Sequence, residues 1–87
     1  MKFMLIYSIT PENQLAVLKR QKEDSGPMEG LTILGGWDSL STGRGFRLIE
    51  TDDLLALKKF NNHWRDLVVV TTEPVIDQEE NRKILGV

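Results

Sequence analysis

Four apolar segments interrupted by two amphipathic ones constrain the fold of this chain more than any other feature. Residues 2–9 predict a first strand, because apolar side chains occupy both of its alternating faces. Residues 31–38 and 44–51 predict a hairpin, with a turn-rich connection between them. Residues 67–75 predict the last strand, which contains three consecutive valines and is stopped by Pro74. The predicted order is therefore one strand, then a pair of strands, then one strand.

The segment between the first two strands predicts a helix. Thr10 is a candidate N-cap, and Pro11 suits the first helical position, where its missing N–H does no harm. The Gly-Pro pair at residues 26–27 is expected to end the helix. The apolar stripe that would face the sheet is Leu15, Val17 and Leu18.

A second helix is predicted from the acidic pair Asp52-Asp53, which favours a helix N-terminus, to about Arg65. Its expected apolar stripe is Leu54, Leu57, Phe60 and Trp64. A short third helix follows Asp77, whose spacing to Glu80 is typical of a capping box. The only apolar anchors of this third helix are Ile84 and Leu85.

This order predicts one α+β domain over residues 1–87. It is a ferredoxin-like β-α-β-β-α-β antiparallel sheet with both main helices on one face and a short extra C-terminal helix. The first and last strands are apolar on both sides, which is typical of strands buried on both faces. A monomer would expose the helix-free face as an apolar patch. We therefore expect a homodimer formed sheet against sheet.

Charge and composition exclude several function classes. With 11 basic and 13 acidic residues the net charge is −2, which argues against nucleic-acid or anionic-membrane binding. The chain has no cysteine, so disulfides and cysteine metal sites are excluded. The apolar start is too short for a signal peptide, and no stretch approaches a membrane span of about 20 residues. We expect a cytoplasmic protein without a cofactor or a metal.

Several short segments, taken in order, carry a resemblance to a known family. They are Met1-Lys2-Phe3-Met4, Pro11-Glu12-Asn13, Leu34-Gly35-Gly36-Trp37, Gly45-Phe46 leading to Glu50, Asp52-Asp53, Trp64-Arg65-Asp66-Leu67 and Thr72-Glu73-Pro74-Val75. With them the chain resembles a domain-of-unknown-function family of small bacterial proteins with the dimeric α/β-barrel fold. The resemblance implies that fold and a dimer, and it implies no activity.

Glu50 is the candidate catalytic residue. It shares one side of its strand with Phe46 and Leu48, and a carboxylate on an apolar face has a raised pKa and can move a proton. The alternative is a solvated glutamate at the end of a strand. We expect Glu50 to border a pocket near Trp37, in the neighbouring strand. The candidate ligand-binding residues are Tyr7, Trp37, Phe46, Glu50 and Trp64.

Other motifs give weaker indications. The only histidine, His63, lies off the apolar stripe of the second helix and is expected to face solvent. Without cysteine or a second histidine, a zinc site is not expected. Arg44-Gly45-Phe46 matches only the start of an RNA-recognition strand, because the second stacking aromatic is missing. The glycines at positions 35, 36, 43 and 45 lack phosphate-loop spacing and are assigned to turns.

Three functions remain open on the sequence. The first is binding of a small planar molecule in a pocket between the sheet and the second helix. The second is a cofactor-free oxygenase or isomerase that acts on an aromatic or quinone-like substrate, by analogy of fold alone. The third is a non-catalytic dimeric module that binds another protein.

Overall fold

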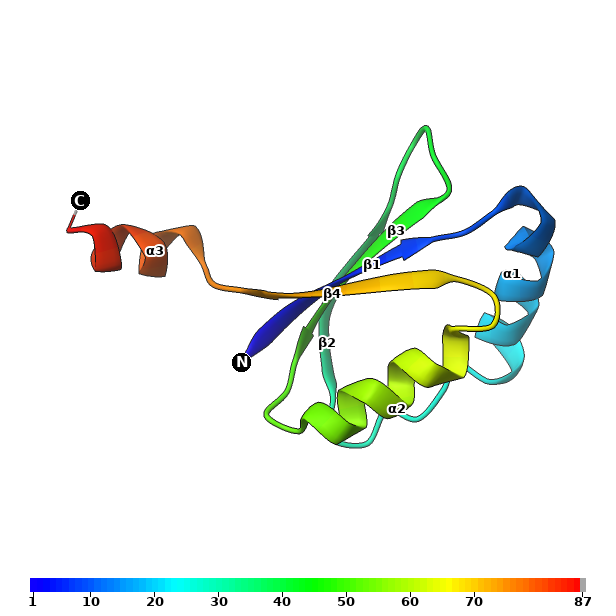
Figure 1. The fold of residues 1–87 in the computed structure, drawn as a ribbon, viewed down its shortest axis with the longest axis horizontal. Coiled ribbons are helices and arrows are strands. Elements are labelled where there is room, and N and C mark those ends of the chain that lie inside the picture. The colour runs from blue at the N-terminus through cyan, green and yellow to red at the C-terminus, as the bar shows by residue number, and fades with distance from the viewer. Residues whose placement is uncertain (87) are drawn as a thin grey trace.

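The computed structural model of the chain describes residues 1–86 and contains one four-stranded antiparallel sheet (Figure 1). The strands are β1 (Lys2–Ser8), β2 (Thr32–Asp38), β3 (Arg44–Glu50) and β4 (Val69–Val75), and they lie in the order β2-β3-β1-β4. The main helices, α1 (Gln14–Glu23) and α2 (Leu54–Trp64), cover the same face of the sheet. The predicted ferredoxin-like α+β fold is confirmed.

The two faces of β1 differ in what covers them. Phe3 and Leu5 are buried beneath the helices, and Tyr7 packs against the same cluster. Met4 and Ile6 alternate with them, so they point to the helix-free face. Residues paired across neighbouring strands share a face, so the register transfers this assignment to β2, β3 and β4.

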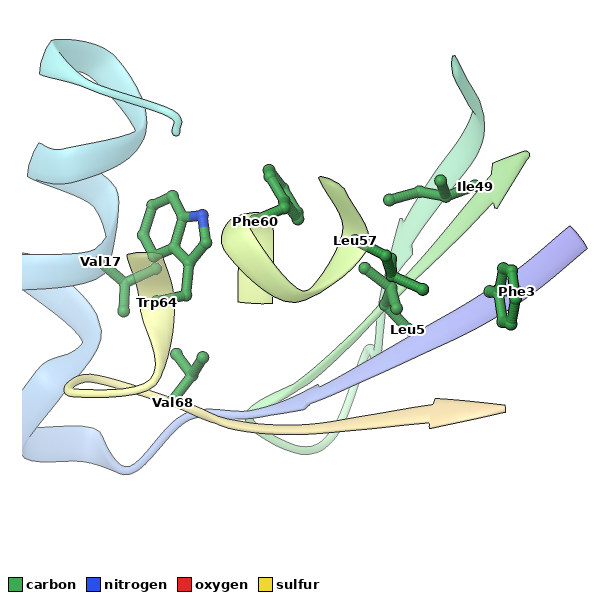
Figure 2. Close-up of a cluster of buried hydrophobic side chains, with 8 residues drawn as sticks. All are labelled: Phe3, Leu5, Val17, Ile49, Leu57, Phe60, Trp64 and Val68. Carbon is green, nitrogen blue, oxygen red and sulfur yellow. The ribbon is translucent and has the colours of Figure 1, made fainter. Parts of the chain in front are cut away.

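The core lies between the helix-covered face and α2 (Figure 2). Its buried members are Phe3, Leu5, Val17, Ile49, Leu57, Phe60, Trp64 and Val68. The stripe predicted for α2 is confirmed at Leu57, Phe60 and Trp64. It is wrong at Leu54, which is 63% exposed because it lies in the first helical turn, beyond the edge of the core. Asp53 caps α2, since its Oδ1 accepts hydrogen bonds from the N–H groups of Leu55 and Ala56, each at 3.1 Å.

The helix bounds predicted around α1 are partly wrong. A 3-10 turn, η1 (Pro11–Asn13), precedes α1, and the Thr10 side chain makes no capping hydrogen bond. The helix ends at Glu23, before the Gly-Pro pair at residues 26–27. The turn is held instead by the backbone, with the N–H of Asn13 donating to the Thr10 carbonyl at 3.0 Å.

The buried face of α1 is also different from the predicted stripe. Leu15 and Leu18 are 81% and 56% exposed, whereas Val17 is buried. Arg20 completes the inward face, because its guanidinium donates to Asp66 and to the His63 carbonyl. Val17 and Arg20 therefore share the inward side of α1, and the predicted stripe is right at Val17 and wrong at Leu15 and Leu18.

The C-terminal helix α3 (Gln78–Leu85) projects away from the sheet and helices (Figure 1). All eight of its residues are exposed. The predicted capping box is wrong: the Asp77 side chain makes no capping bond and instead accepts hydrogen bonds from the Lys2 ammonium, at 3.2 and 3.3 Å. Acidic residues in the first turn and basic residues in the last suit the helix dipole.

Candidate functional site

A cavity of about 420 Å³ lies between the helix-covered face of the sheet and the helices α1 and α2. This volume falls within the range typical of small-molecule sites. The cavity adjoins the core at Trp64, which Figure 2 shows beside Val17 of α1. Its apolar wall consists of Ile9, Val17, Trp64 and Val68.

Two glycines belong to the part of the cavity wall that the sheet contributes. Gly36 in β2 and Gly45 in β3 pair with Arg47 and Tyr7, so both belong to the helix-covered face. A Cβ atom at Gly45 would lie 3.2 Å from Oδ1 of Asp38, whereas one at Gly36 would meet only the Phe46 carbonyl oxygen, at 3.7 Å. The turn assignment is thus wrong for Gly35, Gly36 and Gly45, which lie inside strands. At Gly36 and Gly45 the missing side chains leave space for the cavity.

Arg47 is a cavity residue that the sequence analysis missed. It pairs with Leu5 across the sheet, so its side chain lies on the helix-covered face. Its guanidinium carbon is 5.7 Å from the ring centroid of Tyr7 and 5.8 Å from that of Phe60. Within residues 1–86, its guanidinium has no carboxylate within ion-pair distance and no hydrogen-bond acceptor. The signal that could have identified Arg47 is strand alternation, which assigns it to the same face as Ile49.

The hydroxyl of Tyr7 is the second unpaired polar group at this cavity. Its oxygen is buried and has no hydrogen-bond partner among the described residues. Burial raises the pKa of the Tyr7 phenol above its usual value, and the nearby charge of Arg47 partly offsets that rise. A buried hydroxyl without a partner is uncommon in folded proteins, so this oxygen retains hydrogen-bonding capacity that the described residues do not use.

The structure brings Trp37, Phe46 and Trp64 to the same cavity as Tyr7, but not in the same way. Trp64 is buried, and its Nε1 donates to the Ser25 carbonyl at 3.2 Å. Trp37 and Phe46 pair with each other, and their side chains belong to the helix-free face. The two residues therefore border the cavity with their backbone side. The indole of Trp37 folds over Gly35, where an added Cβ would lie 2.8 Å from its Cη2 atom.

Glu50 lies apart from these residues. It pairs with Lys2 and Thr32 at the far end of β3, four positions along the strand from Phe46, or roughly 13 Å. Its side chain is exposed, and it borders a separate hollow next to α3. The expected placement of Glu50 beside Trp37 is therefore wrong: the two residues share a face, but the register puts them at opposite ends of the hairpin.

The geometry can be compared with known proteins. The family model described as "Domain of unknown function (DUF3303)" matches residues 1–86. The chain belongs to this family. No curated protein and no solved structure gives a significant match to this chain. Membership in DUF3303 confirms that the chain belongs to a domain-of-unknown-function family, and it assigns no reaction.

His63 in this DUF3303 chain was expected to face solvent, and that prediction is wrong. Its side chain is 22% exposed, and its Nε2–H donates to the Asp24 carbonyl at 2.9 Å. The ring also packs edge-on against Trp64, with centroids 5.5 Å apart. The segment after α1 folds back over this part of α2, and that long-range contact covers a side chain lying off the apolar stripe.

Residues 1–86 of this DUF3303 chain contain no group of three or more His, Asp or Glu side chains arranged to hold a metal ion. No helix in that range is long and apolar enough to span a membrane. The cytoplasmic location expected from the sequence stays a prediction.

Proposed function

We propose that this protein binds a small planar molecule in the cavity between the sheet and the helices α1 and α2. The observation that carries the proposal is a cavity of about 420 Å³ whose lining joins apolar side chains to the Arg47 guanidinium, which has no ion-pair partner among the described residues. Apolar walls supply the driving force for binding, and a few unpaired polar groups fix the orientation of a ligand. The indole of Trp64 adds a flat apolar surface to that wall.

Binding is the function that the geometry supports among the three considered. The oxygenase or isomerase alternative rested on analogy of fold alone, and the candidate catalytic residue Glu50 borders a different hollow. The interaction-module alternative has its own support in the helix-free face, which is compatible with a ligand site on the other side of the sheet. We therefore treat dimer formation as a separate proposal below.

The test is a screen of flat aromatic compounds by thermal shift, followed by tryptophan fluorescence titration. The blocking variant is Gly36→Val, because a Cβ there meets no close atom and a branched side chain suits a strand while filling the cavity. The matched control is Glu50→Gln, which lies outside the cavity. We expect hits whose affinity falls about tenfold or more in Gly36→Val and stays unchanged in Glu50→Gln. Hits that bind both variants equally well would contradict the proposal.

We also propose that two copies associate through the helix-free face of the sheet. Met4, Ile6 and Leu48 lie on that face, together with Trp37 and Val69, which are 57% and 70% exposed. A stable interface of this kind buries roughly 1,200–2,000 Å² in total.

The projecting helix α3 supports the same proposal. The radius of gyration, 14.4 Å, exceeds the roughly 12 Å of a compact chain of this length. A helix of eight exposed residues is marginal on its own in water, so it gains from a surface to pack on. Its exposed Ile84 and Leu85, 75% and 66% accessible, would contact a second copy.

Light scattering coupled to size-exclusion chromatography tests the association. We expect a dimer mass at micromolar concentration and a monomer mass for Leu48→Lys, which places a charge on the helix-free face. Leu15→Lys, on the exposed side of α1, is the matched control and should leave the dimer intact. A monomeric parent protein would overturn the proposal, and a monomer formed only by Leu15→Lys would assign the interface to α1 instead.

A further inference from the structure

We infer that the ligand of this cavity is a planar acid, whose carboxylate binds to the Arg47 guanidinium with the Tyr7 hydroxyl as a second donor. This inference rests on the proposed small-molecule function and names the chemical class of the ligand.

Arg47 supplies the first reason. A guanidinium carries five N–H donors and stays charged at any physiological pH. At Arg47 it lies half-buried between two aromatic rings, and no acceptor among the described residues pairs with it. Partial burial removes some of the water around this charge and no residue replaces it, so a bound anion would supply interactions that the guanidinium lacks within the protein.

The position of Tyr7 supplies the second, independent reason. Its ring lies beneath the Arg47 guanidinium, at 5.7 Å, so the two side chains form one wall of the cavity. Its hydroxyl is buried and has no partner among the described residues, so it can donate to a ligand once neighbouring side chains move aside. A carboxylate has two oxygens and accepts several hydrogen bonds, which matches a guanidinium and a phenol side by side.

Asp38 is the carboxylate that competes with such a ligand. It lines the same cavity from the end of β2, and it pairs with Gly45, which lies beside Tyr7. It nevertheless forms no ion pair with Arg47, so its carboxylate oxygens lie farther than 4.0 Å from the guanidinium nitrogens. Asp38 therefore leaves the guanidinium free for a ligand, and it repels an anion that approaches from its own side of the cavity.

The experiment compares two probes of the same shape, 2-naphthoate and 2-naphthamide, which differ in charge. Their affinities are measured by isothermal titration calorimetry at low ionic strength, where screening is weak. The proteins are the parent, Arg47→Gln, Tyr7→Phe and Asp38→Asn. Amide spectra from two-dimensional NMR establish that each variant is folded.

We expect the parent to bind the acid about tenfold or more tightly than the amide, as for hydrogen bonds to a charged group. Arg47→Gln should remove this preference, and Tyr7→Phe should reduce it several-fold. Asp38→Asn should leave the acid bound at least as tightly as in the parent. If Arg47→Gln does not fold, Arg47→Lys decides: a several-fold weaker preference supports the inference, and an unchanged one overturns it.

The failures of the two proposals are distinguishable. Equal affinities of the parent for acid and amide, with both lost in Gly36→Val, would overturn the planar-acid inference and leave the small-molecule site in place. A preference for the acid that survives in Arg47→Gln would place the anion elsewhere and overturn the inference as well. Binding of neither probe to the parent would count against the small-molecule site and the inference together.

Discussion

Arg20 and Asp66, 46 residues apart in the chain, form two parallel hydrogen bonds of 2.6 and 2.9 Å between guanidinium and carboxylate. The same guanidinium donates to the His63 carbonyl at 2.9 Å and lies 5.7 Å from the ring centroid of Trp64. One side chain of α1 therefore joins this helix to the end of α2, and it does so at the edge of the candidate site.

The Arg20–Asp66 pair predicts a pH dependence of stability. The hydrogen bond from Arg20 holds the pKa of Asp66 below its usual value of about 4. A depressed folded-state pKa stabilises the protein above the unfolded pKa, and this contribution is lost as the pH falls through the folded one. We expect Asp66→Asn to be less stable than the parent at pH 7, with a gap that narrows below pH 4. Urea unfolding across that range measures it, and a gap independent of pH would contradict the assignment.

Truncation of α2 side chains to alanine should lower the free energy of unfolding strongly at two buried sites and only slightly at a third, exposed site. Phe60 and Trp64 are 0% and 5% exposed, so Phe60→Ala and Trp64→Ala should each reduce the free energy of unfolding by about 3–5 kcal/mol. Leu54→Ala on the same helix should change it by no more than about 0.5 kcal/mol, because Leu54 is exposed. Chemical denaturation of the three variants checks this, and equal losses would show that the buried face of α2 is misassigned.

His63→Ala should destabilise the fold more than substitution of a surface residue does. The side chain donates a hydrogen bond to the Asp24 carbonyl and packs against Trp64, so the expected loss is about 1 kcal/mol. Lys59→Ala is a suitable control on the exposed side of α2. Thermal and urea unfolding of both variants measure the difference. A loss no greater than that of the control would restore the solvent-facing interpretation.

Two glycines should respond oppositely to alanine. Gly26 has φ +103°, and a Cβ there would lie 3.0 Å from Cδ2 of His63, so Gly26→Ala should cost about 1–2 kcal/mol in backbone strain. Gly36 has extended backbone and open space around an added Cβ, so Gly36→Ala should stay within about 0.5 kcal/mol of the parent. Denaturant unfolding of the pair gives the comparison. Equal losses would count against the folded-back course of the segment after α1.

The ionisation of the phenol tests the environment of the candidate site, because Tyr7 is the only tyrosine in the chain. Burial raises the pKa of Tyr7, and Arg47 holds it partly down. Absorbance at alkaline pH should therefore give a pKa above 10 in the folded protein and a still higher one in Arg47→Gln. Because the unfolded phenol ionises first, near pH 10, stability should fall as the pH rises above that value. A folded pKa at the unfolded value would place Tyr7 in solvent.

The sequence predicted the features that depend on local periodicity. Alternation assigned Phe3 and Leu5 to one face of β1, and helical spacing identified Phe60 and Trp64 as core residues of α2. These predictions hold because the period of a strand or helix places each side chain relative to its neighbours. The element order was sufficient for the fold, since a right-handed crossover puts both helices on one face.

The tertiary structure decided which residues meet across the sheet and between the helices. Glu50 and Trp37 share a face, yet they lie at opposite ends of the hairpin, and the cavity beside Trp37 does not include Glu50. Arg20 turns α1 so that Leu15 faces outward, through a bond to a residue in another element. Arg47 becomes a cavity residue only because Gly36 and Gly45 leave space on the helix-covered face. The periodicity of a chain fixes directions within an element, whereas a site depends on distances between elements, which long-range packing sets.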